Sequence, residues 1–208
     1  MLTIYLARHG QTDWNKARRL QGWTDIPLNR TGEAQAAQLA ERLASARLDA
    51  IYTSPLTRAK TTAAALTGRA SITEVAGLRE RCMGAFEGVF LDGRDLEREG
   101  VFKARKHAPG DDLDGGEAVE AFQRRVNETI SEIVSAHTNG AILVVGHGAT
   151  NSMVLGRFMG LELSGIARLW IANDDLFRIE TEDGAIGRVW KEITPALVSR
   201  ANGLSAVR

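Results

Sequence analysis

Leu6-Ala-Arg8-His9-Gly10-Gln11-Thr12-Asp13-Trp14-Asn15 is the stretch around which the sequence is organised, because an apolar segment ends within it. That segment, residues 2–7, is only about six residues long and rich in β-branched and aromatic types, which favours a strand over a helix. In open α/β sheets, ligands bind at the carboxyl ends of the strands. A guanidinium beside an imidazole there indicates an anion site next to a nucleophile or a base. The tripeptide Arg8-His9-Gly10 is weak evidence by itself, since about one such chain in a hundred carries it by chance.

The composition is that of one soluble globular domain without an overall charge bias. A chain of 208 residues can bury most of a core. Its 44% of hydrophobic and 25% of charged residues are ordinary proportions. Lys and Arg together number 26, as do Asp and Glu, so no net field draws the protein to nucleic acid or to an anionic membrane. A preference for anions must therefore come from a local cluster of residues.

Cysteine use and the N-terminal residues favour a cytoplasmic protein. The single cysteine, Cys82, cannot form a disulfide within the chain and fits a reducing compartment. The N-terminal residues lack the basic region and the long apolar segment of a signal peptide. No apolar run approaches the roughly 20 residues that span a bilayer, so no membrane segment is expected. No coiled-coil pattern or continuous apolar face is evident, and the sequence therefore predicts no particular oligomeric state.

Short apolar segments and a C-terminal hairpin are the predicted strands. Residues 141–145 form a continuous apolar run, which is typical of a central parallel strand. The hairpin is expected to be antiparallel and joined through Asp183-Gly184. The predicted strands are residues 2–7, 49–53, 72–75, 141–145, 176–181 and 186–191.

Apolar residues at helical spacing predict the helices that pack on this sheet. The first is expected to begin with Thr31 as its N-cap, the second near Pro55, the third to span residues 117–136, and the fourth to follow Gly148. The positions expected to face the core are Ala36, Leu39, Ala40 and Leu43; Ala59, Thr62, Ala63 and Leu66; Val119, Phe122, Val126, Ile130 and Ile133; and Val154, Leu155, Phe158 and Met159.

No repeat, low-complexity stretch or linker divides the chain, so residues 1–208 are predicted to form one domain. Residues 89–115 are polar and are expected to form a lid or a short helical excursion. Residues 196–208 are expected to be a loosely held tail. Most cations of the excursion are expected to lie on a solvated face. They are Arg94, Arg98, Lys103, Arg105 and Lys106.

Three predicted strand ends place cationic or imidazole side chains at one edge of the sheet. Arg8 and His9 follow the first strand, Arg58 opens the helix after the second, and His147 follows the most apolar strand. The free N–H groups and the dipole at the first turn of a helix favour a phosphate near Arg58. An irregular segment further along the chain adds Glu80.

A zinc site is the alternative use of His9, His147 and Glu80, because two histidines and a glutamate are a known ligand set. Two arginines in the same pocket would repel the cation, and the His-Glu-x-x-His spacing is absent. The residues therefore suit a dianion, and neither a metal nor a cofactor is predicted. The remaining histidines, His107 and His137, lie in polar surroundings and are expected at the surface.

The same residues suit transfer of a phosphoryl group. Arg8 and Arg58 offer planar, permanently charged donors to phosphate oxygens. A neutral imidazole can attack phosphorus in line and form a phosphohistidine, which splits one difficult step into two. A carboxylic acid can protonate the leaving oxygen. His147 can supply further positive charge or a hydrogen bond.

The ordered set of motifs resembles the histidine phosphatase superfamily, in its phosphoglycerate mutase-like branch with an Arg-His-Gly signature. The similarity covers residues 6–148, which is most of the chain. Each motif is weak alone, whereas the set in this order is specific. The matching motifs are Arg8-His9-Gly10-Gln-Thr-Asp-Trp-Asn15, Leu20-Gln21-Gly22, Asp25-Ile-Pro-Leu28, Gly32-Glu-Ala-Gln35, Ser54-Pro-Leu-Thr-Arg58-Ala-Lys-Thr61, Leu78-Arg-Glu80, Phe86-Glu-Gly88 and Gly146-His147-Gly148.

The resemblance implies a three-layer α/β/α sandwich with a mainly parallel sheet, and catalysis without a metal. It makes His9 the phosphorylated nucleophile. Glu80 becomes the proton donor and later the base that activates water. Arg8, Arg58 and His147 are assigned to the rest of the phosphate pocket.

The resemblance also implies contacts to the substrate near the mouth of the pocket. Asn15, Gln21 and Gly22 match ligand-contacting positions, and Gly148 beside the second histidine is placed with them. Lys60 occupies the position of a second basic contact. An ammonium there binds phosphate less well than the two-pronged guanidinium of an arginine.

The length of the excursion favours a phosphatase over a mutase. Mutases that resemble this chain have a longer stretch between the acid and the second histidine, whereas Glu80 and His147 are only 67 positions apart. A short segment broken by glycines excludes water poorly. We therefore expect hydrolysis of small phosphorylated metabolites with release of inorganic phosphate. Phosphoglycerate mutase-type transfer and a non-catalytic phospho-ligand sensor remain the alternatives. The glycines between Glu80 and His147 include Gly93, Gly100, Gly110, Gly115 and Gly116.

Glu87 lies close to Glu80 in the sequence and could compete with it as the acid. Because Glu87 precedes Gly88, it is expected to be structural.

Overall fold

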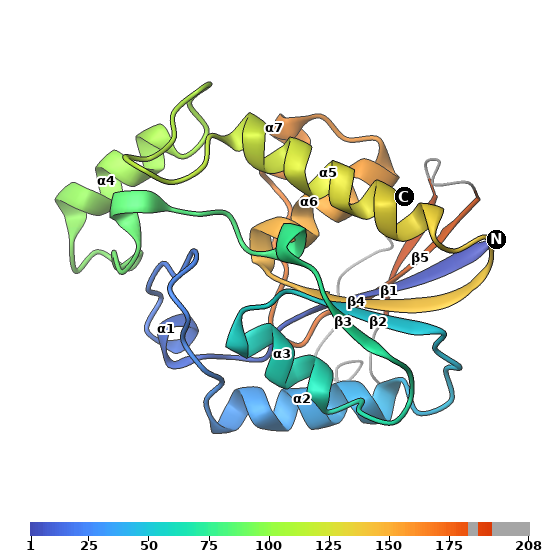
Figure 1. Ribbon diagram of the computed structural model, residues 1–208. Coiled ribbons are helices and arrows are strands. Elements are labelled where there is room, and N and C mark those ends of the chain that lie inside the picture. The colour runs from blue at the N-terminus through green and yellow to red at the C-terminus, as the bar shows by residue number, and fades with distance from the viewer. Residues whose placement is uncertain (183–186, 193–208) are drawn as a thin grey trace, which may run out of the picture.

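The computed structural model describes residues 1–182 and 187–192, and a twisted six-stranded sheet lies at their centre (Figure 1). The strand order is β3-β2-β4-β1-β5-β6. The pairs from β3 to β1 are parallel, whereas the β1–β5 and β5–β6 pairs are antiparallel. The sheet is thus mixed but mainly parallel. The strands are β1 (Leu2–Arg8), β2 (Ala50–Thr53), β3 (Ile72–Glu74), β4 (Gly140–Gly146), β5 (Leu176–Thr181) and β6 (Arg188–Glu192).

The predicted strands are confirmed, with ends that differ by at most two residues among those described. The central position of β4 is also confirmed, because it pairs in parallel with β1 on one side and with β2 on the other. The hairpin is antiparallel and joins the sheet beside β1, as expected. Its turn at Asp183-Gly184 lies outside the described residues, as does the tail at 196–208.

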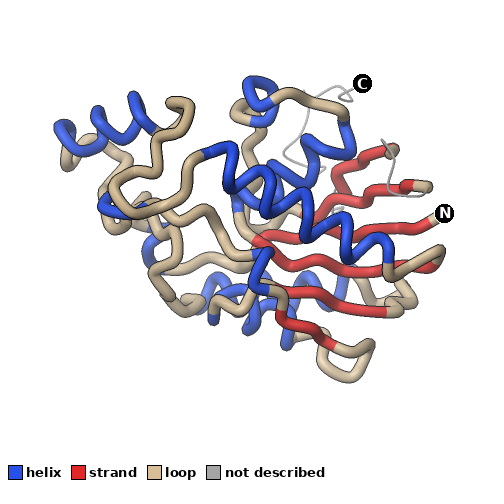
Figure 2. The backbone as a smooth tube through the Cα atoms, turned by 45° about the horizontal axis from the view of Figure 1, so that its top comes forward, coloured by secondary structure: helices blue, strands red, loops and turns tan. Residues whose placement is uncertain are grey.

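Helices cover both faces of the sheet and complete the three layers. In Figure 1, α2 (Arg30–Arg42) and α3 (Thr57–Ala64) lie below the sheet, and α5 (Val119–Ser135) and α6 (Gly148–Met159) lie above it. Figure 2 shows α5 running across the strands on its own side. Alternate strand residues face opposite cores. Thus Leu6 packs with α5 and α6, and Ala7 packs with α2 and α3. No helix in the described part of the chain is long and apolar enough to cross a membrane.

The N-cap of α2 corrects one sequence prediction. The cap is Asn29, whose side chain accepts a hydrogen bond from the backbone N–H of Gly32 at 3.0 Å, whereas Thr31 lies inside the helix. Both residue types suit a cap, and Asn29 has the extended backbone that a cap requires. The core-facing residues of α2 are buried as expected, except for Ala40, which is only partly buried.

Several very short helices were not predicted. They have three or four residues each, too few for a periodic pattern to be visible in sequence. Two are α-helices, α1 (Asp13–Lys16) and α7 (Leu163–Ile166), and two are 3₁₀-helices, η1 (Ala76–Leu78) and η2 (Gly84–Phe86).

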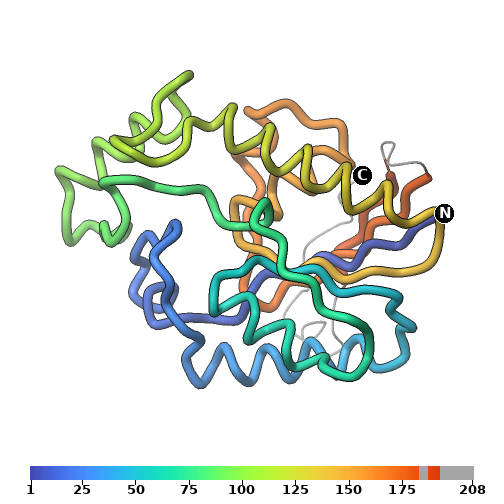
Figure 3. The backbone as a smooth tube through the Cα atoms, in the orientation of Figure 1, coloured from blue at the N-terminus to red at the C-terminus, as the bar shows by residue number. Residues whose placement is uncertain are grey.

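Residues 89–115 form the helical excursion that the sequence predicts, with α4 (Leu96–Arg105) as its helix. The excursion has a small core of its own: Met83, Phe86, Val89, Phe102 and Leu113. It lies against the loop that contains α1, beyond the carboxyl ends of the parallel strands (Figure 3).

Most cations of the excursion lie on an exposed, charged face, as expected, and three of them form ion pairs there. Arg94 contacts Asp92 at 2.7 Å, and Lys103 contacts Glu99 at 2.5 Å. Arg105 contacts both Asp111 and Asp114.

Candidate active site

The register between β1 and β4 brings the two strand-end histidines together. Arg8 lies opposite Gly146 in this parallel pair, and the backbone N–H of His9 donates to the carbonyl of Gly146 at 3.0 Å. The next residues along the two strands are His9 and His147, whose ring centroids are 5.0 Å apart. The sequence prediction that these strand ends converge is therefore confirmed by the geometry.

His9 is held as a neutral imidazole with one free nitrogen. Its side chain is only 2% exposed, and its Nδ1 lies 2.7 Å from the carbonyl oxygen of Gly10. A carbonyl can only accept, so Nδ1 carries the proton and Nε2 carries the lone pair. Burial lowers the pKa of His9 well below 6.5, and the charges of Arg8 and Arg58 lower it further. A neutral ring with a free Nε2 is the form that can attack phosphorus.

His147 is held in the opposite tautomer. It is the N-cap of α6 and is fully buried. Arg58 donates from Nε to Nδ1 of His147 at 3.3 Å, so the proton of the ring lies on Nε2. This Nε2 is buried and has no hydrogen-bond partner among the described residues. Burial also lowers the pKa of His147 well below 6.5, with Arg58 as the next cause.

Arg58 lies in the first turn of α3 and is fully buried. Its Nη2 donates to the carbonyl of Gly22 at 2.7 Å, and its Nη1 donates to that of Thr24 at 2.9 Å. Burial lowers the pKa of Arg58 to about 10, so the guanidinium stays charged at neutral pH. The helix begins there because Asp25 accepts from both the backbone N–H and the hydroxyl of Thr57. A carboxylate thus caps a helix whose own N-cap residue provides no side-chain cap.

Arg8 lies at the end of β1 with its guanidinium in the same region. Its Nη1 donates to the carbonyl of Ile171 at 2.6 Å, and its Nε is buried without a partner among the described residues. Burial lowers the pKa of Arg8, and Glu80 partly offsets that effect. Gly148 lies beside this guanidinium, since a Cβ at Gly148 would be in ordinary van der Waals contact with the Arg8 Cζ at 3.5 Å.

Glu80 is held by the start of α6. Its two carboxylate oxygens accept hydrogen bonds from the backbone N–H groups of Ala149 at 3.1 Å and Thr150 at 3.2 Å. The hydroxyl of Thr150 and the backbone N–H of Arg81 add two more contacts. This arrangement fixes the carboxyl group beside the strand ends, because helix N-termini favour anionic groups.

Glu87 has a structural role, as the sequence predicts. Its carboxylate accepts from the backbone N–H groups of Trp23 at 2.7 Å, Thr24 at 2.8 Å and Met83 at 3.2 Å. It therefore ties the loop after α1 to the segment before the excursion. Glu87 is not part of the cavity wall, whereas Glu80 is.

These residues open into one cavity of about 830 Å³. Its lining includes Arg8, His9, Arg58 and Glu80, and His147 lies directly behind them beside His9. Such a volume lies within the range of small-molecule sites, in its upper part. The cavity also brings in four of the five predicted substrate contacts, which are Asn15, Gln21, Gly22 and Gly148.

Lys60 is the predicted contact that the structure does not bring to the cavity. It lies on the exposed side of α3 and pairs with Glu74, its Nζ 3.5 Å from Oε1. Lys60 follows Arg58 by two positions, and residues two apart on a helix do not face the same way. The sequence match placed it correctly along the chain but not in space.

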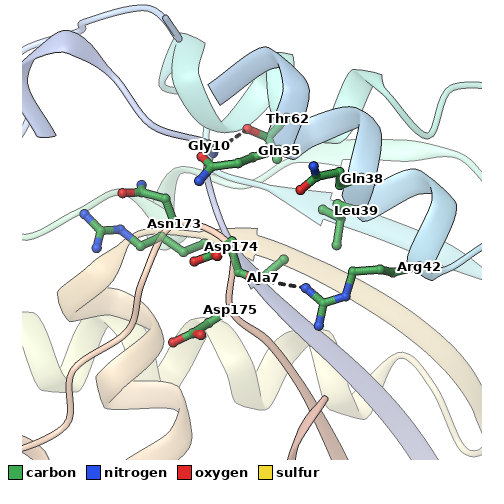
Figure 4. A pocket seen from close by; sticks show the side chains of 11 residues that line it. Ala7, Gly10, Gln35, Gln38, Leu39, Arg42, Thr62, Asn173, Asp174 and Asp175 are labelled. Atoms are coloured by element: carbon green, nitrogen blue, oxygen red, sulfur yellow. Dashed lines mark hydrogen bonds between the residues drawn. The ribbon is translucent and has the colours of Figure 1, made fainter. Parts of the chain in front are cut away.

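Two residues that support His9 were missed by sequence reasoning. Asn173 donates from Nδ2 to the backbone carbonyl of His9 at 2.8 Å, and Thr62 accepts from the N–H of Gly10 at 3.0 Å. Thr62 was expected only to face the core, and Asn173 follows the nucleophile by 164 positions with no local signal. Figure 4 shows the bond between Gly10 and Thr62, at the edge of a cavity of only about 20 Å³. That space suits a single water rather than a substrate.

The other histidines are placed differently from each other. His107 is exposed, as expected, but it also lies on the lining of the large cavity. His137 is partly buried, and its Nε2 lies 2.8 Å from the hydroxyl of Tyr52. Within residues 1–182 and 187–192, no three side chains of His, Cys, Asp or Glu gather as a metal site.

Comparisons with known proteins agree with this geometry. The chain is 33% identical over 186 residues to "Probable phosphoglycerate mutase GpmB" of Salmonella choleraesuis, with 88% of this chain and 86% of the relative covered. The structure of Bacillus stearothermophilus YhfR is 31% identical, with a TM-score of 0.80, and 91% of this chain and 95% of that chain are covered.

A mycobacterial glucosyl-3-phosphoglycerate phosphatase, solved in complex with VO3, is 25% identical with a TM-score of 0.79. That comparison covers 92% of this chain and 98% of the other. The family model described as histidine phosphatase superfamily (branch 1) matches residues 4–192. The chain therefore belongs to this superfamily, whose members are phosphatases or mutases.

Proposed function

We propose that the chain is a metal-independent phosphatase that hydrolyses small phosphorylated molecules through a phosphohistidine at His9. One observation carries the proposal. The His9 ring is neutral, it has its Nε2 lone pair free, and it shares a cavity with two guanidinium groups and a carboxyl group. Arg8 and Arg58 would hold the phosphate oxygens, and the Nε2–H of His147 would add a hydrogen bond.

In the first step, the Nε2 lone pair of His9 forms a bond to phosphorus while the bond from phosphorus to the alcohol oxygen breaks. The electron pair of the broken bond goes to that oxygen. Glu80, as a carboxylic acid, gives the oxygen its proton and becomes a carboxylate. Arg8 and Arg58 stabilise the charge that spreads over the phosphoryl oxygens.

In the second step, water attacks the phosphorus of phosphohistidine and the bond to Nε2 breaks. The Glu80 carboxylate takes a proton from the water and becomes an acid again. Inorganic phosphate leaves, and His9 returns to its neutral form. The bond from Nδ1 of His9 to Gly10 keeps the same ring orientation throughout.

A phosphoglycerate mutase-type transfer is the second candidate, favoured by the curated relative with that name. A mutase must keep water from its phosphohistidine. The cavity lining of this chain includes exposed residues, Arg18, His107 and Trp170, so water has access to the site. This access supports hydrolysis over transfer.

Release of inorganic phosphate from a panel of phosphomonoesters, with EDTA present, tests the proposal. A mutase assay on 3-phosphoglycerate should run beside it. Phosphate release with little phosphoryl transfer is the expected result. Transfer without release would make the protein a mutase. Binding of phosphate esters without either reaction would make it a sensor.

Three further expectations stay predictions: that residues 1–208 form a single domain, that residues 89–115 act as a lid, and that the protein is cytoplasmic.

A further inference from the structure

The part of the cavity wall beyond the reacting groups is rich in apolar side chains. Each comes from a different part of the fold than the strand ends that carry His9 and Arg8 (Figure 1). The excursion, α5, α6, α7 and the segment after α7 all contribute. Representative members are Phe102, Phe122, Met153, Leu163, Leu169 and Trp170.

Trp170 is the most exposed of these side chains, with 84% of its surface accessible. One exposed aromatic residue needs no explanation by itself, but an aromatic residue that joins other apolar side chains on a cavity wall indicates a place where an apolar group binds. Leu163 and Leu169 lie on the same cavity wall as Trp170, and both are only partly buried.

Four cations, Arg18, Arg19, Arg81 and Lys106, lie on the same wall, and the protein itself engages two of them, Arg19 and Arg81. The Nε of Arg19 donates to the carbonyl of Gly88 at 2.6 Å, and its guanidinium lies 4.0 Å from the centroid of the Trp14 ring. Arg81 donates to the carbonyls of Glu117 and Lys106. These contacts reduce what the two guanidinium groups can offer to a polar substrate. Of the apolar side chains, Phe102, Phe122 and Met153 are at most 6% exposed because they also pack in the core. Leu163 and Leu169 are only partly buried, and Trp170 is exposed, so these three offer the most apolar surface to a ligand.

We propose that the preferred substrates are phosphomonoesters of bulky, apolar alcohols rather than small phosphorylated acids. The inference rests on the proposed phosphatase function and adds its substrate class. The phosphoryl group would lie at the buried arginines and histidines, and the apolar alcohol would cover the wall formed by α5, α6, α7 and Trp170. A cavity of about 830 Å³ is near the upper end of small-molecule sites, so a three-carbon acid would fill little of it.

A series of n-alkyl phosphates tests the inference, because the leaving oxygen is chemically the same in every member. We expect kcat/KM to rise by up to about fourfold for each methylene that becomes buried. From ethyl to octyl phosphate the total rise should be at least about tenfold, mainly through a lower KM. Concentrations must stay below those at which the longer esters form micelles.

Two tryptophan variants show whether the cavity wall causes the effect. Trp170→Ala should reduce the advantage of octyl over ethyl phosphate by about threefold or more, because it removes apolar surface at the cavity. Trp190→Ala is the matched control. Trp190 lies on β6, next to the guanidinium of Arg178, and it is not on the cavity lining. This control should keep the full advantage of the octyl ester.

The possible outcomes separate the inference from the proposed function. If no ester, including p-nitrophenyl phosphate, releases phosphate, the proposed function fails. If esters are hydrolysed but kcat/KM is independent of chain length, the function stands and the inference is overturned. Faster turnover of 3-phosphoglycerate than of octyl phosphate would also overturn it, as would equal effects of the two tryptophan variants.

Discussion

Arg58 donates a hydrogen bond from Nε to Nδ1 of His147 over 3.3 Å, and this contact gives His147 the tautomer opposite to that of His9. His9 has its proton on Nδ1, where the Gly10 carbonyl accepts it, and presents a lone pair at Nε2. His147 presents an N–H at Nε2 instead. One ring is thereby suited to attack phosphorus and the other to donate to its oxygens.

Arg58 should act on the phosphoryl group of every substrate. Arg58→Ala removes a buried charge and two or more donors, so kcat/KM should fall by about 10²-fold or more for all phosphomonoesters. Arg58→Lys should recover little, because an ammonium cannot donate to His147 and phosphate as a guanidinium does. Steady-state kinetics on three unrelated esters measures this.

Lys60→Ala is the control for the Arg58 variants, since it removes a cation from the same helix. Lys60 pairs with Glu74 outside the cavity. Its removal should change kcat/KM by less than about twofold. A loss as large as that of Arg58→Ala would return Lys60 to the substrate site.

Glu80 should matter most when the leaving oxygen is a poor leaving group. Glu80→Gln should slow phosphorylation of the enzyme by an alkyl phosphate by roughly 10²- to 10⁴-fold. The loss on p-nitrophenyl phosphate should be much smaller, because its leaving group needs little protonation. Single-turnover measurements are required, since Glu80 also assists the second step.

Glu87→Gln tests the competing assignment. Glu87 binds backbone N–H groups of two loops, so its loss should lower stability and affect both esters alike. A loss in Glu87→Gln that is selective for the alkyl ester would make Glu87 the acid.

The buried histidines should make the protein less stable as the pH falls. The folded state holds His9 and His147 neutral, with pKa values well below 6.5, whereas the unfolded chain protonates both near 6.5. The unfolded state therefore binds more protons below this pH, and the free energy of unfolding decreases as pH is lowered. Each histidine contributes up to about 1.4 kcal/mol per pH unit.

Urea denaturation between pH 5.5 and 7.5, in buffer without phosphate, measures this dependence. His147→Asn should flatten it by about one proton, because the asparagine oxygen can still accept from Arg58. An unchanged slope in His147→Asn would mean that His147 is already protonated in the folded state.

The strand-end residues could be predicted from sequence because each lies beside a strand of strongly apolar character. Local patterns therefore place Arg8, His9, Arg58 and His147 at or just after strand ends. Parallel pairing of the strands then brings these ends together at one edge of the sheet. Glu80 was found by its motif alone, since the segment around it is irregular.

Other features of the site depend on contacts that local patterns do not contain. Asn173 supports the His9 backbone from the far end of the chain, and no pattern of spacing indicates that contact. The side to which Lys60 points depends on the rotation of α3, which the sequence match ignored. The choice between Asn29 and Thr31 as N-cap depends on one backbone conformation that both residues allow.

Direct detection of the phosphoenzyme is the measurement that tests the central claim. Rapid denaturation at alkaline pH during turnover of a phosphate-labelled ester should trap up to one label per chain, which is lost on warming in acid. Peptide mapping should place it on His9, and His9→Ala should lose the label together with roughly 10³-fold or more of the activity. A His9→Ala enzyme that turns over at a near-normal rate, or a label on another residue, would contradict the account.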